Sequence, residues 1–270
     1  MSAVATSETT QVYLPFVEAD ASADAAELQA QMEEIGYLFF RNLLPDEAIL
    51  PVRRHILELC EEAGWLDPSR DLMEGIVAEG VVPCTEGHDA YHKVYRKVLK
   101  LPDFFALPEH PALMGIAEKI LGGEAFVHPR RIGRMGFPNF QVATTPPHQD
   151  HFYIRGAVDT YSCWLPLGDA PIDIGCLAIG AGTHKRGFLN HSVHVPGAIG
   201  GMAVPLDDAE PEWHSSGFNQ GDVVYFHSYT IHRALPNLTT NRLRLSTDNR
   251  YQRPTEKIEP DALLPHLKLD

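Results

Sequence analysis

Residues 147–151 of the chain are Pro147-His148-Gln149-Asp150-His151. In an extended strand alternate side chains point to the same face, so we expect His148 and Asp150 to project together while Gln149 points away. One imidazole and one carboxylate can occupy two neighbouring positions on a metal ion. A third ligand supplied by the fold would complete a site of two histidines and one carboxylate, with open positions for substrate, cosubstrate or oxygen. This stretch therefore predicts a metal centre if a partner lies elsewhere in the chain.

The candidate partner is His232, which follows a turn and a predicted buried strand at 221–227. The next strand pattern alternates strictly, so its polar residues share one face: Arg242, Arg244, Ser246 and Asp248. A guanidinium binds a carboxylate through two parallel hydrogen bonds, and a nearby hydroxyl can add another. Each of these features alone is more often structural. Their order along one chain favours a metal centre beside a site for a dicarboxylate.

Helix formers dominate the first part of the chain. Helices are predicted at 21–34, 45–64, 91–99 and 111–121, with a short aromatic strand at 36–40. Pro51 lies inside the second predicted helix, where it predicts a kink or a restart. Residues 1–12 are expected to form a polar terminus.

After Gly123 the pattern changes to short β-branched and aromatic runs separated by turn residues. Strands are predicted at 125–128, 132–137, 160–165, 176–179, 222–226 and 242–251. This spacing is typical of an all-β sandwich or barrel. We therefore expect one domain over 1–270, in which a mostly helical region (1–123) packs on a β-core (124–253) that is followed by a tail (254–270). Residues 67–90 and 190–218 suit loops or lids over an active site.

Composition excludes several classes of protein. The 270 residues contain 22 Lys and Arg against 36 Asp and Glu, and the resulting net charge of −14 argues against nucleic acid or an anionic membrane as the partner. The chain shows no apolar run long enough to span a bilayer and no signal peptide, so we expect a cytoplasmic protein. Its four cysteines form no CxxC pair and are expected to be buried, reduced thiols: Cys60, Cys84, Cys163 and Cys176.

One family shares these features in this order. The chain resembles the phytanoyl-CoA dioxygenase (PhyH-like) family of iron(II)- and 2-oxoglutarate-dependent oxygenases, over roughly residues 125–251. The resemblance implies a mainly β fold, with a double-stranded β-helix core of the jelly-roll or cupin-like type flanked by α-helices. The matching residues are His148-Gln149-Asp150, Trp164 in YSCWLPLGD, Gly175-Cys176-Leu177, Gly182-Thr183-His184-Lys185, the run 221–227, His232 with Pro236-Asn237, and Arg244-Leu245-Ser246.

The same resemblance implies roles for individual residues. It implies that iron(II) is bound by His148, Asp150 and His232. It further implies a 2-oxoglutarate site, in which Arg244 pairs with the distal carboxylate, with contributions from Ser246, Trp164 and Gln141.

The sequence offers two alternatives to these assignments. Arg242 competes with Arg244 for the 2-oxoglutarate carboxylate because both lie on the same predicted face. His184 belongs to a turn that the family places outside the iron sphere, so it is not expected to be a metal ligand.

The implied reaction is the oxidation of an unactivated C–H bond of a small-molecule substrate by O₂, with release of succinate and CO₂. Hydroxylation is favoured over halogenation because Asp150 stands where halogenating relatives carry a small residue. The acidic chain argues mildly against a CoA ester as substrate. Candidates to line the pocket are Phe152, Tyr153, Arg155 and residues 88–97.

Two other functions stay open from the sequence. The first is a cupin-like metalloenzyme that does not use 2-oxoglutarate, against which Arg244 and Ser246 count. The second is a non-catalytic metabolite-binding module, which has no need for three metal ligands. The oligomeric state is not predicted.

Overall fold

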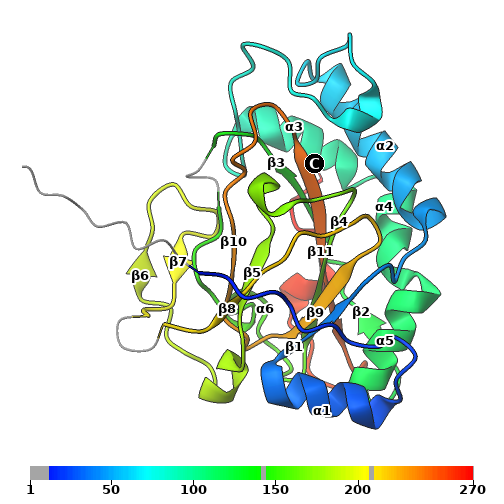
Figure 1. Cartoon of the computed structure of the whole chain (residues 1–270), viewed down its shortest axis with the longest axis vertical. Coiled ribbons are helices and arrows are strands. Elements are labelled where there is room, and N and C mark those ends of the chain that lie inside the picture. Colours follow the sequence, from blue (N-terminus) through cyan, green and yellow to red (C-terminus); the bar gives the residue numbers. More distant parts are fainter. Residues whose placement is uncertain (1–11, 141–143, 207–209, 270) are drawn as a thin grey trace, which may run out of the picture.

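The computed structural model describes residues 12–140, 144–206 and 210–269. Its largest sheet is antiparallel, with strand order β1–β9–β4–β11–β2, and β3 also pairs with β11 (Figure 1). The long strand β11 therefore has β4 along one edge and the two short strands along the other. The six strands span Tyr37–Phe40 (β1), Phe126–Val127 (β2), Ile132–Gly136 (β3), Tyr161–Pro166 (β4), Val223–His227 (β9) and Arg244–Gln252 (β11).

A second, smaller sheet has the order β10–β5–β8. Its strands are His232–Ala234 (β10), Leu177–Gly180 (β5) and Trp213–His214 (β8), and a separate hairpin pairs Val193–His194 (β6) with Met202–Ala203 (β7). A buried cluster fills the space between the two sheets and includes Phe39, Trp164, Ile179 and Val224. These facing antiparallel sheets confirm the predicted jelly-roll, cupin-like core.

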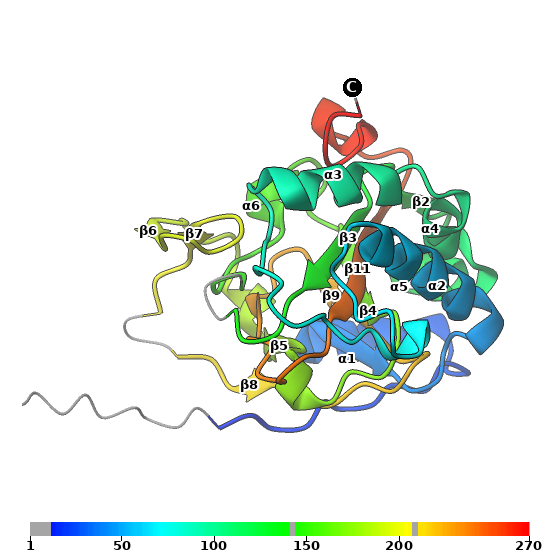
Figure 2. The same ribbon diagram turned by 90° about the horizontal axis from the view of Figure 1, so that it is seen from above.

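Helices cover the outer face of the larger sheet (Figure 2). They are Ala25–Ile35 (α1), Asp46–Glu62 (α2), Asp89–Val98 (α3), Pro102–Ala106 (α4) and Pro111–Leu121 (α5). The largest hydrophobic cluster lies between these helices and the sheet. In β1, Tyr37 and Phe39 belong to the inter-sheet cluster, whereas Leu38 and Phe40 belong to the helix-side cluster. Because both faces of β1 are covered, every position in it is apolar.

The predicted restart at Pro51 is wrong, since α2 continues through it, and the predicted kink stays a prediction. Pro51 and Glu47 are exposed, so the backbone carbonyl that proline leaves without its helical partner lies on the side facing water. On the opposite face, Ile49, Val52 and Ile56 are buried and hold both halves of the helix against the core. Tertiary packing outweighs the local cost of the proline here.

The structure bears on several other predictions from the sequence. The four cysteines are free and buried, as expected. The predicted loop at 190–218 contains the short strands β6, β7 and β8. In the part of the chain that the structure describes, no helix combines the length and apolarity needed to cross a membrane. The polar terminus at 1–12 lies almost entirely outside the described residues, and the division at residues 123 and 253 stays a prediction.

Alanine substitutions at two glycines test how closely the backbone packs around Gly175. Gly175 has φ +89°, and an added Cβ would lie 2.5 Å from the backbone oxygen of Leu235. Gly64 has φ +73° with nothing within 4 Å of an added Cβ. Gly64→Ala should lose about 1 kcal/mol of unfolding free energy, from backbone strain alone. Gly175→Ala should lose about 3 kcal/mol or more in a urea titration, because a backbone clash adds to that strain. Equal losses would contradict this account of the turn.

Candidate metal centre and its pocket

The backbone places two histidines side by side. His148 donates its N–H to the carbonyl of His232 at 3.0 Å, and His232 returns an N–H bond to the carbonyl of His148 at 3.0 Å. This isolated antiparallel bridge joins the start of β10 to the 147–151 stretch. The two imidazole centroids lie 4.1 Å apart, so the side chains leave the same face of the bridge.

Asp150 reaches the same place by a different route from the one predicted. Its backbone is helical (φ −59°, ψ −32°) and it precedes the short helix α6, His151–Ile154. The strand-alternation argument is therefore wrong at this residue, because the carbonyl of Asp150 accepts the N–H groups of Tyr153 and Ile154 and begins a helical turn. The side chain still faces the histidines, with Oδ1 at 3.9 Å from His148 Nε2 and 3.8 Å from His232 Nε2.

Backbone carbonyls set the tautomers of both histidines. His148 Nδ1 lies 2.7 Å from the oxygen of Pro146, and His232 Nδ1 lies 3.0 Å from the oxygen of Thr230. A carbonyl can only accept, so each Nδ1 carries a proton and each Nε2 presents a lone pair.

The ionisation states suit metal binding. Burial lowers the pKa of His148 to about 3, and burial also lowers the pKa of His232, so both rings are neutral at neutral pH. Burial alone would raise the pKa of Asp150, but the guanidinium of Arg250 and a hydrogen bond from Ser162 hold it well below its usual value. Two neutral imidazoles therefore face one carboxylate.

This arrangement fits a divalent cation. One donor atom from each of His148, Asp150 and His232 lies within 4.8 Å of the others, and all three residues are buried. With no proton between them, the three electron-pair donors repel one another unless a cation lies among them. The donor set of two imidazoles and one carboxylate is the one that non-haem iron(II) prefers.

Arg250 and Ser162 fix the orientation of the carboxylate. Arg250 Nη2 lies 3.0 Å from Asp150 Oδ2 and 3.1 Å from Oδ1, and its Nε lies 3.3 Å from Oδ2. Ser162 donates its hydroxyl to Oδ2. Oδ2 receives three of these four bonds, and Oδ1, which receives one, is the oxygen that faces the histidines.

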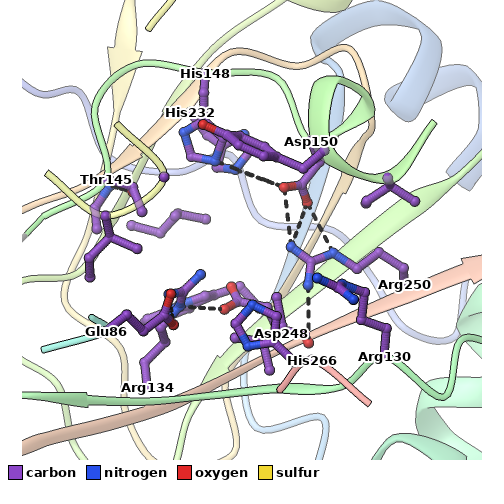
Figure 3. Close-up of a pocket in the computed structure, with 18 of the residues that line it drawn as sticks. Glu86, Arg130, Arg134, Thr145, His148, Asp150, His232, Asp248, Arg250 and His266 are labelled. Atoms are coloured by element: carbon purple, nitrogen blue, oxygen red, sulfur yellow. Dashed lines mark hydrogen bonds and ion pairs between the residues drawn. The ribbon is translucent and has the colours of Figure 1, made fainter. Parts of the chain in front are cut away.

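A cavity of about 200 Å³ opens beside the three residues (Figure 3). Arg244 and Trp164 line it, and Ser246 lies buried two residues along β11. Arg244 donates one bond to the carbonyl of Gly175. Among the described residues, Arg244 Nε and Ser246 Oγ are buried without a hydrogen-bond partner. Buried polar groups left in this way favour a missing acceptor such as a carboxylate.

The alternative candidates lie elsewhere. Arg242 lines a separate surface depression with Arg53 and Asp169, away from the cavity of the three ligands. His184 Nε2 lies 3.0 Å from the oxygen of Glu33, outside the cluster. Gln141 falls outside the described residues.

The predicted pocket-lining segments contribute unequally. Tyr153 and Ile154 line the cavity, whereas Phe152 stacks on His191 at 4.3 Å between centroids. Neither Arg155 nor residues 88–97 are among the residues that line it. Both predicted loops contribute to the wall, through Glu86 from 67–90 and through residues 199–200 from 190–218.

Sequence reasoning missed the polar residues at the base and far end of the cavity. They are Glu86, His128, Arg130, Arg134, Arg250 and His266, whereas Asp248 had been placed on the polar face of its strand. Alternation along β11 could have found Arg250, since it continues the face of Arg244, Ser246 and Asp248. Nothing in the predicted tail indicated that His266 returns to the pocket.

Two facing antiparallel sheets around a His–Asp–His cluster define the cupin-like class of metal-dependent oxygenases. Residues 32–245 match the family described as phytanoyl-CoA dioxygenase (PhyH). The chain belongs to this family and is an iron(II)- and 2-oxoglutarate-dependent oxygenase. The predicted family, fold class and cofactors (iron(II), 2-oxoglutarate and O₂) are confirmed.

Individual relatives agree with this assignment. The chain is 28% identical to a 1-deoxypentalenic acid 11-beta-hydroxylase from Streptomyces exfoliatus over 258 residues, which cover 90% of this chain and 86% of the relative. It superposes on the epimerase SnoN in complex with Fe3+, alpha ketoglutarate and nogalamycin RO with a TM-score of 0.63 at 18% identity, covering 87% of this chain and 86% of that one. For EvdO2 from Micromonospora carbonacea var. aurantiaca the TM-score is 0.59 at 20% identity, covering 92% and 99%.

Removing the Ser162 hydroxyl should weaken metal binding without unfolding the protein. Ser162→Ala frees Asp150 Oδ2 from one donor, so calorimetric titration of metal-free protein with Mn²⁺ should give a Kd roughly 10-fold higher. Ser228→Ala is the matched control, because it removes a buried hydroxyl that bonds only the backbone oxygen of Val158. An unchanged Kd in Ser162→Ala would contradict the orienting role.

Acid should destabilise the fold through His128. Burial lowers the pKa of His128 to about 4, whereas an unfolded histidine titrates near 6.5. As the pH falls from 6.5 to 4 the unfolded chain binds the proton first, so the unfolding free energy should fall by roughly 3 kcal/mol from this residue. His128→Phe should show a correspondingly shallower loss in urea titrations across this range. An identical pH dependence in both proteins would contradict it.

Proposed function

We propose that this chain hydroxylates an unactivated C–H bond of a small-molecule substrate, with iron(II) held by His148, Asp150 and His232. The observation that carries the proposal is the convergence of three unprotonated donor atoms on one buried point. The similarity to a 1-deoxypentalenic acid hydroxylase supports a small organic substrate. The predicted cytoplasmic location stays part of the proposal, and four buried free thiols fit a reducing compartment.

The cosubstrate site that we propose is built on β11 and its neighbour β4. Arg244 carries the distal carboxylate of 2-oxoglutarate, Ser246 adds a hydrogen bond, and Trp164 forms the adjoining wall. The unpartnered Arg244 Nε and Ser246 Oγ support this placement, because a buried donor gains most from a charged acceptor. Arg242 is not placed there, since it lines a different cavity.

When bound, iron(II) and 2-oxoglutarate supply the oxidising chemistry that couples O₂ to C–H oxidation, with release of succinate and CO₂. The protein contributes orientation and charge. The His148–His232 bridge keeps both Nε2 atoms aimed at the cavity, and Arg250 holds the Asp150 carboxylate in place. The buried surroundings restrict water at the reacting bond, which favours reaction with substrate over unproductive oxidation.

Anaerobic titration tests the proposal directly. Iron(II) followed by 2-oxoglutarate should give the weak visible charge-transfer band of the chelate in the wild type, and Asp150→Ala should abolish it. Arg244→Met should raise the 2-oxoglutarate Kd roughly 10- to 100-fold, because a charge-assisted bidentate contact is lost.

The matched control is Arg242→Met, which removes an arginine from the neighbouring position of the same segment. Its titration should follow the wild type, and a large effect there would exchange the two assignments. Folded wild-type protein that gives no band would overturn the oxygenase proposal. A cupin-like enzyme without 2-oxoglutarate or a metabolite-binding module would then replace it.

A further inference from the structure

The charges that line the cavity do not balance. Four arginines face it, Arg130, Arg134, Arg244 and Arg250, against three carboxylates, Glu86, Asp150 and Asp248. His148 and His232 add no charge, because each keeps a single ring proton on Nδ1 against a backbone carbonyl, and burial lowers the pKa of His128 and of His266. One positive charge is therefore in excess, in a chain whose net charge is −14.

Iron and cosubstrate leave this excess unchanged. Iron(II) carries two positive charges and 2-oxoglutarate carries two negative ones, so together they add nothing to the sum. The loaded cavity therefore still carries one unpaired positive charge, which favours an anionic ligand.

The unmatched arginine is Arg130. Arg250 pairs with Asp150, and Arg134 pairs with Glu86 and Asp248. Arg244 is assigned to the cosubstrate. Among the described residues Arg130 has no carboxylate partner, and its side chain makes one long bond, 3.4 Å, to the backbone oxygen of Asp261. In the view of Figure 3 Arg130 lies below Arg250, on the side away from Asp150, and Arg130 and His266 line the same cavity.

His266 supplies a second hydrogen-bond donor to the same cavity. Gly133 donates its N–H to Tyr95 Oη at 3.2 Å, and Tyr95 Oη lies 2.8 Å from His266 Nδ1. The tyrosine proton has His266 as its acceptor, because reversing this bond would leave a buried hydroxyl unsatisfied. His266 is consequently neutral with its proton on Nε2, and it lines the cavity as a hydrogen-bond donor.

We propose that the substrate is a small monocarboxylic acid, whose carboxylate is bound by Arg130 and by the Nε2–H of His266. One guanidinium and one neutral donor match a single carboxylate in charge and in hydrogen bonding. The side chains of Ile132, Ile154 and Leu177 line the same cavity and receive the apolar body. This inference rests on the proposed function, since it assigns Arg244 and the three metal ligands to cosubstrate and iron.

Binding of matched acids and amides tests the inference. The probes are cyclohexanecarboxylic acid and cyclohexylacetic acid, each paired with its uncharged amide, titrated by calorimetry into protein that holds Mn²⁺ and 2-oxoglutarate. The acids should bind the wild type more tightly than the amides. Arg130→Met should weaken the acids roughly 10- to 100-fold and leave the amides unchanged, and Arg130→Lys should restore part of the loss. His266→Phe should weaken the acids by a smaller factor.

Arg54→Met is the control, because Arg54 is an exposed arginine on α2 away from the cavity. Repeating the titration on Arg244→Met without metal or cosubstrate separates this inference from the proposed function, since the acid preference and its loss on removing Arg130 should persist there. Retained Mn²⁺ affinity in Arg130→Met shows that the variant is folded. No preference for acids over amides, including no binding of either, overturns the inference, as does an equal loss for both on removing Arg130.

Discussion

The reciprocal backbone bonds between His148 and His232 are the constraint on which the rest of the site depends. They fix two imidazoles at the distance of neighbouring metal ligands before any ion is present. The carbonyls of Pro146 and Thr230 then fix the tautomers, so both lone pairs point the same way. Once Asp150 joins them, the cluster is electrostatically incomplete and is satisfied by a cation. Organisation of the site is therefore supplied by main-chain geometry, which substitutions of side chains elsewhere leave in place.

Arginines pair with the carboxylates of the cavity, although the protein as a whole is acidic. Arg250 neutralises and orients Asp150, while Arg134 joins the loop residue Glu86 to Asp248 on β11. The exposed surface carries most of the negative charge, whereas the cavity holds an excess of positive charge. Such a contrast concentrates field lines at the pocket and draws anions towards it. The net charge of a chain is accordingly a poor guide to the ligand of one pocket.

The sequence predicted those parts of the fold that depend on short-range periodicity or on motifs in a fixed order. The helices, the buried strand at 36–40 and the cupin-like core followed from periodicity and resemblance. Strand alternation failed at Asp150, because two backbone N–H groups downstream pull its carbonyl into a helical turn. The restart expected at Pro51 does not occur for the opposite reason, since packing of Ile49 and Ile56 overrides a local preference. The residues at the far wall of the pocket could not be predicted from the sequence, because contacts such as that of Tyr95 with His266 join residues that share no motif.

The wide spacing of the cavity-lining residues has a consequence for how the protein folds. Groups that meet in one cavity come from positions as distant as Glu86 and His266, and strands distant in sequence such as β1 and β9 pair in the larger sheet. Closing such long loops is entropically costly and makes folding slow. A partly folded chain without β10 lacks the histidine bridge, and one without β11 lacks Arg250, so either chain has an incomplete metal site. The complete set of groups that bind and orient the metal therefore exists only once both strands have docked.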